Sequence, residues 1–162
     1  MTGDWLPPHH GNCLGCGPDN PASLRMRFRL DGERVGGQVT PTRLHEGAPG
    51  YVHGGAISTV LDDAIGTLLY VTKTPAVTAK LEVDFRSPAF IDHTYDVAAW
   101  IGGRDGRKLH LHGDVREGDR LVAEGYALFI VVDAEHFRRG VEASGDQTGI
   151  PPSGKRGTQL PW

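Results

Sequence analysis

Residues 53–70 read HGGAISTVLDDAIGTLLY, a glycine pair at the start of a helical stretch, and they decide the fold. From Ala56 onward the apolar residues recur every three or four positions, which is the spacing of one buried helix face. The stretch therefore predicts an amphipathic helix over residues 56–70. Gly54 and Gly55 lie where the first helical N–H groups have no acceptor within the helix, so these donors are available to an anion or a polarised carbonyl.

On both sides of this helix, apolar and polar residues alternate with the period of two that is typical of half-buried strands. These patterns cover residues 24–30, 35–39, 77–85, 95–101, 108–116 and 120–132. Short turns rich in Gly and Asp connect most consecutive strands and force antiparallel pairing, because parallel neighbours need long crossovers. A single long apolar helix must be covered by the sheet. We therefore expect an α+β domain in which a curved antiparallel sheet of about six strands wraps a central helix.

Length and composition indicate one domain with irregular ends. A chain of 162 residues is long enough for a single core. Residues 1–22 are rich in Gly, Pro and His and predict an irregular N-terminal arm, while residues 23–133 carry the domain. Over residues 134–162 the periodicity vanishes, which predicts a flexible C-terminal tail.

Charge and hydropathy exclude several classes of function. The formal net charge of −3 gives no basic footprint for nucleic acid. No apolar run approaches the roughly 20 residues that a membrane span requires. Residues 1–12 lack the apolar segment of a signal peptide, so we expect a cytoplasmic protein.

The two cysteines, Cys13 and Cys16, form a C-x-x-C pair. A single disulfide between residues so close in sequence cannot stabilise a domain of this size. A zinc site needs four ligands; His9 or His10 could supply a third, but no fourth is evident nearby. We therefore interpret the pair as part of a tight surface loop and expect no metal.

Two adjacent helix carboxylates, Asp62 and Asp63, must point to different sides. At about 100° per residue, Asp63 falls in the middle of the polar arc, where we expect it to be solvated. Asp62 falls at the border of the apolar arc, beside the notch left by Gly66. A carboxylate there is partly desolvated, which suits it to accept a proton, although a solvated surface position is the alternative.

Asp62 and Gly54 cannot act together from one helix. Eight residues separate them, a rise of about 12 Å at 1.5 Å per residue. A carbonyl-polarising donor and a water-activating carboxylate must both lie within about 3 Å of one reacting centre. If both are catalytic, the Asp62 of one subunit must meet the Gly54 of another, which predicts a two-fold symmetric assembly.

Four segments resemble the PaaI-type acyl-CoA thioesterases of the hotdog fold. The helix start at residues 53–62 resembles the family's helix signature, and the loop before it matches over residues 46–52. Residues 12–21 are similar to the cysteine-bearing start of one branch of these enzymes. Residues 77–88 match the family's strand that ends in a Ser-Pro or Arg-Pro pair.

The resemblance implies a single hotdog domain that hydrolyses acyl-CoA to a free acid and coenzyme A without a cofactor. By matching positions, Asp62 is the catalytic carboxylate, acting as general base or nucleophile. The Gly54 N–H polarises the thioester carbonyl from the partner subunit, with Gly55 in support, and the Thr78 hydroxyl orients the water or the carboxylate. On its own, Thr78 is an ordinary strand former.

The sequence indicates the substrate contacts and the partners less precisely than the catalytic residues. His53 either fixes the turn before the helix or contacts the substrate, and Arg86 is a candidate for the coenzyme A phosphates, as are Arg104, Arg107 and Lys108. The expected assembly is a homodimer or a dimer of dimers. The alternative is a non-catalytic module on the same fold that binds acyl-CoA or an acyl-carrier protein.

Overall fold

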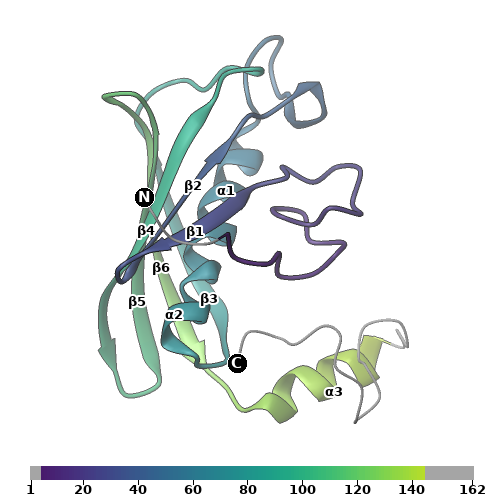
Figure 1. Cartoon of the computed structure of the whole chain (residues 1–162), viewed down its shortest axis with the longest axis vertical. Coiled ribbons are helices and arrows are strands. Elements are labelled where there is room, and N and C mark those ends of the chain that lie inside the picture. Colours follow the sequence, from purple (N-terminus) through teal and green to yellow (C-terminus); the bar gives the residue numbers. More distant parts are fainter. Residues whose placement is uncertain (1–4, 145–162) are drawn as a thin grey trace.

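The computed structural model describes residues 5–144, in which a curved antiparallel sheet packs against one long helix (Figure 1). The six strands are β1 (Arg27–Asp31), β2 (Arg34–Val39), β3 (Ala76–Phe85), β4 (Tyr95–Asp105), β5 (Lys108–Glu117) and β6 (Arg120–Val131). Their order in the sheet is β1-β2-β4-β5-β6-β3, and every neighbouring pair is antiparallel. The predicted α+β class and the antiparallel sheet are confirmed.

The central helix is α1 (Gly54–Thr67), and a further turn, α2 (Leu69–Thr72), follows it. A short 3-10 helix, η1 (Arg43–His45), precedes it in the loop after β2. Lys73 ends α2 in the left-handed conformation, with φ 48°. No helix within residues 5–144 combines the length and the apolar character that a bilayer span demands.

Two glycines of the sheet face α1 and allow it to pack against the backbone of the sheet. Gly113 of β5 and Gly125 of β6 stand opposite each other in the register. A Cβ at Gly113 would lie 3.2 Å from Ile65 Cγ1, and one at Gly125 would lie 3.3 Å from Leu61 Cδ1. Leu61 and Ile65 are fully buried there, so the apolar stripe of α1 rests directly on the middle of the sheet.

The two edges of the sheet differ. At the β1 edge, Trp5 forms an isolated antiparallel bridge with Arg29, and the Leu6 N–H donates to the Phe28 carbonyl at 2.8 Å. At the other edge, β3 pairs with β6 on its inner side, and no strand of residues 5–144 pairs with its outer side. The β3 edge is therefore the one that is open to another chain.

A β-bulge in β3 changes which side chains face the helix. The register moves from Thr78 opposite Phe129 to Lys80 opposite Leu128, so Ala79 is the extra residue. After the bulge Leu81 packs against the core. Thr78 therefore shares a face with Leu81 rather than with Lys80, against the strict alternation that the sequence predicts.

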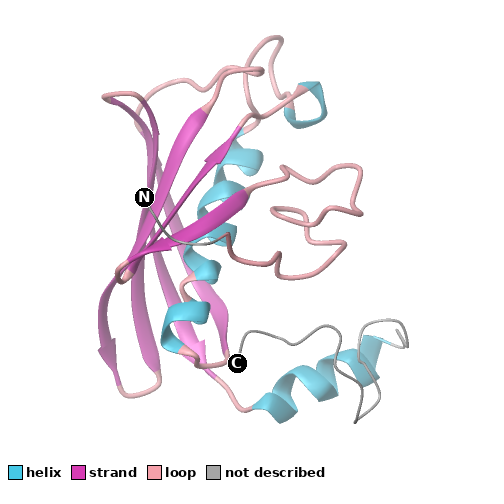
Figure 2. Ribbon diagram, viewed as in Figure 1, coloured by secondary structure: helices cyan, strands magenta, loops and turns pink. Residues whose placement is uncertain are grey.

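The N-terminal arm covers the face of α1 that the sequence assigns to solvent. Figure 2 shows this loop segment on the side of α1 away from the sheet. The Tyr70 hydroxyl donates to the Pro7 carbonyl at 3.2 Å, and His9 contacts Asp63 at 2.9 Å. Asp63 is only 8% exposed, so its predicted solvation is wrong. A helical wheel cannot reveal a loop from elsewhere in the chain that packs on the polar arc.

The C-terminal segment begins with a helix that the sequence analysis did not predict. Residues Ala134–Ser144 form α3, where Arg138 pairs with Glu135 one turn before it and with Glu142 one turn after it. Such pairs stabilise exposed helices without any apolar periodicity. The rest of the predicted tail, residues 145–162, lies outside the described residues.

Candidate active site

Asp62 and Thr78 meet between α1 and β3. The Thr78 hydroxyl donates to Asp62 Oδ1 at 3.1 Å. Asp62 is half-buried at the border of the helix stripe, while Thr78 is exposed on its strand. The bulge at Ala79 makes this contact possible, because it turns Thr78 toward the helix. The pair holds a carboxylate in a defined orientation at the open edge of the sheet.

The start of α1 presents one unpaired backbone donor. His53 is the N-cap, and its Nδ1 accepts from the Gly55 N–H at 2.8 Å. The His53 carbonyl accepts from Ala56 and Ile57. Within residues 5–144 the Gly54 N–H has no acceptor, so Gly54 rather than Gly55 offers a donor to a ligand. His53 thus fixes the turn, one of the two roles expected of it.

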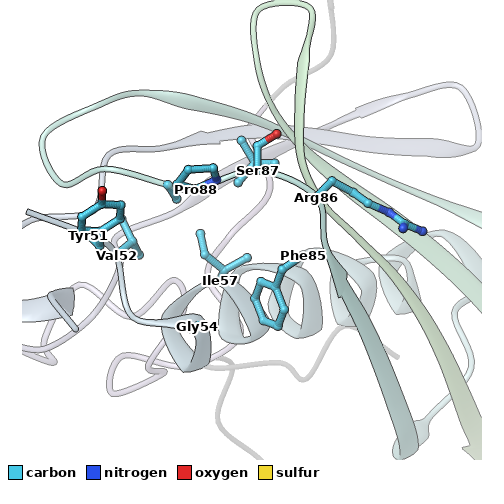
Figure 3. A pocket seen from close by; sticks show the side chains of 10 residues that line it. Tyr51, Val52, Gly54, Ile57, Phe85, Arg86, Ser87 and Pro88 are labelled. Carbon is cyan, nitrogen blue, oxygen red and sulfur yellow. The ribbon is translucent and has the colours of Figure 1, made fainter. Parts of the chain in front are cut away.

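A pocket of about 350 Å³ opens beside this helix start (Figure 3). Its lining combines the loop before α1 with the end of β3: Tyr51, Val52, Gly54, Ile57, Phe85, Arg86, Ser87, Pro88, Ala89 and Val122. The Phe85 ring lies over the first turn of α1, since a Cβ at Gly54 would be 3.4 Å from Phe85 Cζ. Phe85 is 56% exposed and was not singled out from the sequence, where it reads as one more apolar residue of the strand.

Arg86 lines the same pocket, but two carboxylates already balance its charge. Its Nε donates to Glu124 Oε1 at 2.8 Å, and its NH2 lies 3.3 Å from Asp84 Oδ2. The guanidinium extends away from Ile57 and Phe85 (Figure 3). A phosphate at Arg86 would therefore compete with Glu124 and Asp84.

One chain does not bring all the predicted residues together. Gly54 and Arg86 line the pocket, whereas Asp62 and Thr78 do not. The structure keeps Gly54 and Asp62 on one continuous helix, eight residues apart. The rise of about 12 Å that separates them leaves the two halves of the predicted site at different places along the β3 edge.

A second polar group lies on the opposite face of α1. His9, Cys13, Cys16 and Asp63 place one ligand-type atom each within 4.8 Å of one another. Cys16 is 8% exposed, so the interpretation of the C-x-x-C pair as a surface loop is wrong for this residue. The fourth residue is Asp63, which is far from the cysteines in sequence. No spacing rule could have found it.

The charges in this group are strongly perturbed. Burial lowers the pKa of His9, but its hydrogen bonds and charge interactions with Asp63 and Cys13 together outweigh that effect and raise the pKa to about 9. The hydrogen bond with Cys16, aided by His9, lowers the pKa of the Cys13 thiol to about 3. Burial raises the pKa of the Asp63 carboxyl. The group therefore favours a thiolate at Cys13 beside a protonated imidazole.

The chain matches one family of known proteins. Residues 49–124 fit the family model of the thioesterase superfamily. The acyl-coenzyme A thioesterase THEM4 of Mus musculus is 36% identical over 95 residues, which cover 57% of this chain and 41% of that protein. The chain thus spans about two fifths of the length of this curated relative.

Solved structures agree with the fold. A crystal structure described as a thioesterase superfamily protein has a TM-score of 0.67 and 28% identity, covering 70% of this chain and 60% of that one. The PaaI protein from the phenylacetic acid degradation operon of E. coli has a TM-score of 0.64 and 17% identity, covering 72% of this chain and 88% of that one. The resemblance drawn from the sequence is confirmed.

Proposed function

We propose that this chain hydrolyses acyl-CoA thioesters to a free acid and coenzyme A, since residues 49–124 fit the family model of the thioesterase superfamily. The curated relative that carries this name supports the substrate class. The observation that carries the proposal is the hydrogen bond from Thr78 to Asp62, since a purely structural helix has no need of an oriented carboxylate at its exposed border.

In this proposal, the hydroxyl of Thr78 holds Asp62 Oδ1 and leaves Oδ2 to a water molecule. Asp62 takes a proton from the water as general base while the water oxygen attacks the thioester carbonyl. In the second route Asp62 attacks the carbonyl carbon as a nucleophile and takes up the acyl group as a mixed anhydride, which water then hydrolyses to the free acid and the Asp62 carboxylate. In both, the carbon–sulfur bond breaks and coenzyme A leaves as a thiolate, a good leaving group that does not require a strong general acid.

The Gly54 N–H of the partner subunit stabilises the negative charge that develops on the carbonyl oxygen. This N–H lies at the start of α1, where the helix dipole also favours negative charge. Losing one such donor typically lowers turnover by about a hundredfold. Gly55 supports the loop rather than the oxygen, because its N–H is bonded to His53.

A homodimer in which the two β3 edges lie together would complete the site. Gly54 and Phe85 lie toward one end of this edge, and Asp62 with Thr78 lie further along it. A two-fold axis through the edge would bring each Asp62 toward the Gly54 of the other copy. Dimer pairs could associate further without changing this arrangement.

The pocket at Gly54 is proposed to receive the substrate near the thioester, with Arg86 at its outer side and His53 capping the adjacent helix start. Asp84 and Glu124 reduce the attraction of Arg86 for a phosphate group. The cytoplasm is the proposed compartment, which agrees with Cys13 and Cys16 not being joined as a disulfide.

The test is release of free thiol from a panel of short, long and aryl acyl-CoA substrates. Asp62→Asn is expected to abolish turnover while the oligomer persists in size-exclusion chromatography. Asp105→Asn, which changes an exposed carboxylate in the β4–β5 turn, is the matched control. Undiminished hydrolysis by Asp62→Asn would refute the assignment. Acyl-CoA binding without any hydrolysis by the unmodified chain would favour the non-catalytic module.

A further inference from the structure

We propose that His9, Cys13, Cys16 and Asp63 form a zinc site that fastens the N-terminal arm to helix α1. The set contains one imidazole, two thiols and one carboxylate, which are the donor types that zinc takes in proteins. Two thiols with nitrogen and oxygen donors favour zinc over the harder magnesium and calcium ions. All four positions come from the protein, which is typical of a structural rather than a catalytic zinc site.

The donor atoms all lie within 4.8 Å of one another, and three of the distances between them lie close to those of a tetrahedral zinc site. Bond lengths of about 2.0–2.3 Å to zinc place neighbouring ligands about 3.3–3.8 Å apart. His9 Nδ1 lies 3.4 Å from Cys16 Sγ, and Asp63 Oδ1 lies 3.2 Å from Cys13 Sγ and 3.8 Å from Cys16 Sγ. The contact of His9 with Asp63 is shorter, at 2.9 Å, and would open slightly around an ion.

The outer contacts orient the ligands toward one point. The Thr67 hydroxyl donates to the Asp63 backbone carbonyl at 2.8 Å. The oxygen of the same hydroxyl can therefore accept from His9 Nε2, which lies 3.4 Å away. His9 Nδ1 then faces the two sulfurs and the carboxylate. A second contact of this kind, which fixes the ring of a ligating histidine, is common around zinc.

The loop is also shaped for this arrangement. The His9 N–H donates to Cys16 Sγ at 3.2 Å, and the Gly17 N–H donates to the Cys13 carbonyl at 2.9 Å. A Cβ at Gly15 would lie 2.3 Å from Asp63 Cγ, so no side chain fits between the loop and the carboxylate. The chain turns tightly enough to bring both sulfurs over α1.

A buried polar atom points to a ligand independently of these distances. Asp63 Oδ2 is buried and has no hydrogen-bond partner within residues 5–144. A buried carboxylate oxygen without a hydrogen-bond partner destabilises the folded state, because it has lost its contacts with water. An ion pair between His9 and Asp63 would leave that atom unsatisfied, whereas a cation at the centre of the four residues would attract both carboxylate oxygens.

Metal analysis of the purified chain, followed by reconstitution with Zn²⁺, tests the proposal. We expect about one zinc per chain, falling to less than about a tenth in Asp63→Asn and Cys13→Ser. Asp62→Asn is the matched control: the neighbouring carboxylate lies outside the set, so this variant should keep its zinc. Zinc content is independent of hydrolysis, so failure of the proposed catalysis would not affect this result.

Two readouts remain informative if a variant folds poorly. The unmodified chain should melt at a lower temperature after treatment with a chelator and recover with Zn²⁺, and Co²⁺ should give the absorption bands of a tetrahedral thiolate site. His9→Ala should lose the cobalt bands, whereas His10→Ala, which removes an exposed neighbouring ring, should keep them. The proposal would be overturned if the reconstituted chain bound no zinc and showed no absorption bands with Co²⁺. A disulfide between Cys13 and Cys16 in the purified chain would also overturn it.

Discussion

Replacing Thr78 by Val removes one hydroxyl and keeps the shape of the side chain, so it isolates the contact with Asp62. The hydroxyl donates to Asp62 Oδ1 at 3.1 Å. A hydrogen bond to a charged acceptor contributes about 1.5–3 kcal/mol, and the exposed position of Thr78 places this one near the lower end. Since about 1.4 kcal/mol corresponds to a tenfold change in rate, we expect kcat to fall about tenfold.

The measurement is steady-state thiol release under saturating acyl-CoA, together with thermal unfolding. Thr78→Ser restores the hydroxyl and is expected to recover most of the lost rate. KM and the melting temperature should change little in both variants, because the side chain is exposed and only one of its atoms is altered. A Thr78→Val variant with the turnover of the unmodified chain, or a Thr78→Ser variant as slow as Thr78→Val, would refute this role of the hydroxyl.

Three further predictions concern packing and substrate binding. Gly125→Val should lower the free energy of unfolding by about 1–3 kcal/mol in urea titrations, because the valine side chain would collide with α1. Gly103→Val is the control: a Cβ there meets no atom within 4 Å, so the free energy of unfolding should change less. Tyr95→Phe should lower the free energy of unfolding by about 1–3 kcal/mol, since the buried hydroxyl bonds both the N–H and the carbonyl of Phe90. An unchanged melting temperature would show that water replaces the hydroxyl. Arg86→Ala should raise KM for acyl-CoA and leave kcat alone, and an unchanged KM would remove Arg86 from the binding site.

Much of the fold could be predicted because its elements bury one face each. The alternation at residues 95–101 and 108–116 and the apolar stripe at residues 56–70 correspond to β4, β5 and α1. Residues 24–26 were expected in a strand, yet they lie before β1; the Leu24 N–H donates to the Leu14 carbonyl and the Met26 N–H to that of Gly15. Their apolar side chains are buried beneath the arm, which alternation alone cannot distinguish from a sheet.

The site was harder to predict, because it depends on contacts between distant segments. The border position of Asp62 was visible from the helix, but its contact with Thr78 depends on the bulge at Ala79, which breaks the alternation on which strand prediction rests. The role of His53 as a cap follows from its place before Gly54, and the structure shows this cap. His9 and Asp63 are 54 residues apart and meet only because the arm folds back over α1.

The unequal edges of the sheet limit how copies of this chain can assemble. Trp5 and Leu6 pair with the outer side of β1, while no strand in the part of the chain that the structure describes pairs with the outer side of β3. A sheet with one open edge can pair with a single partner copy. Once the two β3 edges have paired, strand pairing stops at two copies and does not continue into a fibre. Removing the arm would uncover the second edge and make the protein prone to open-ended polymerisation.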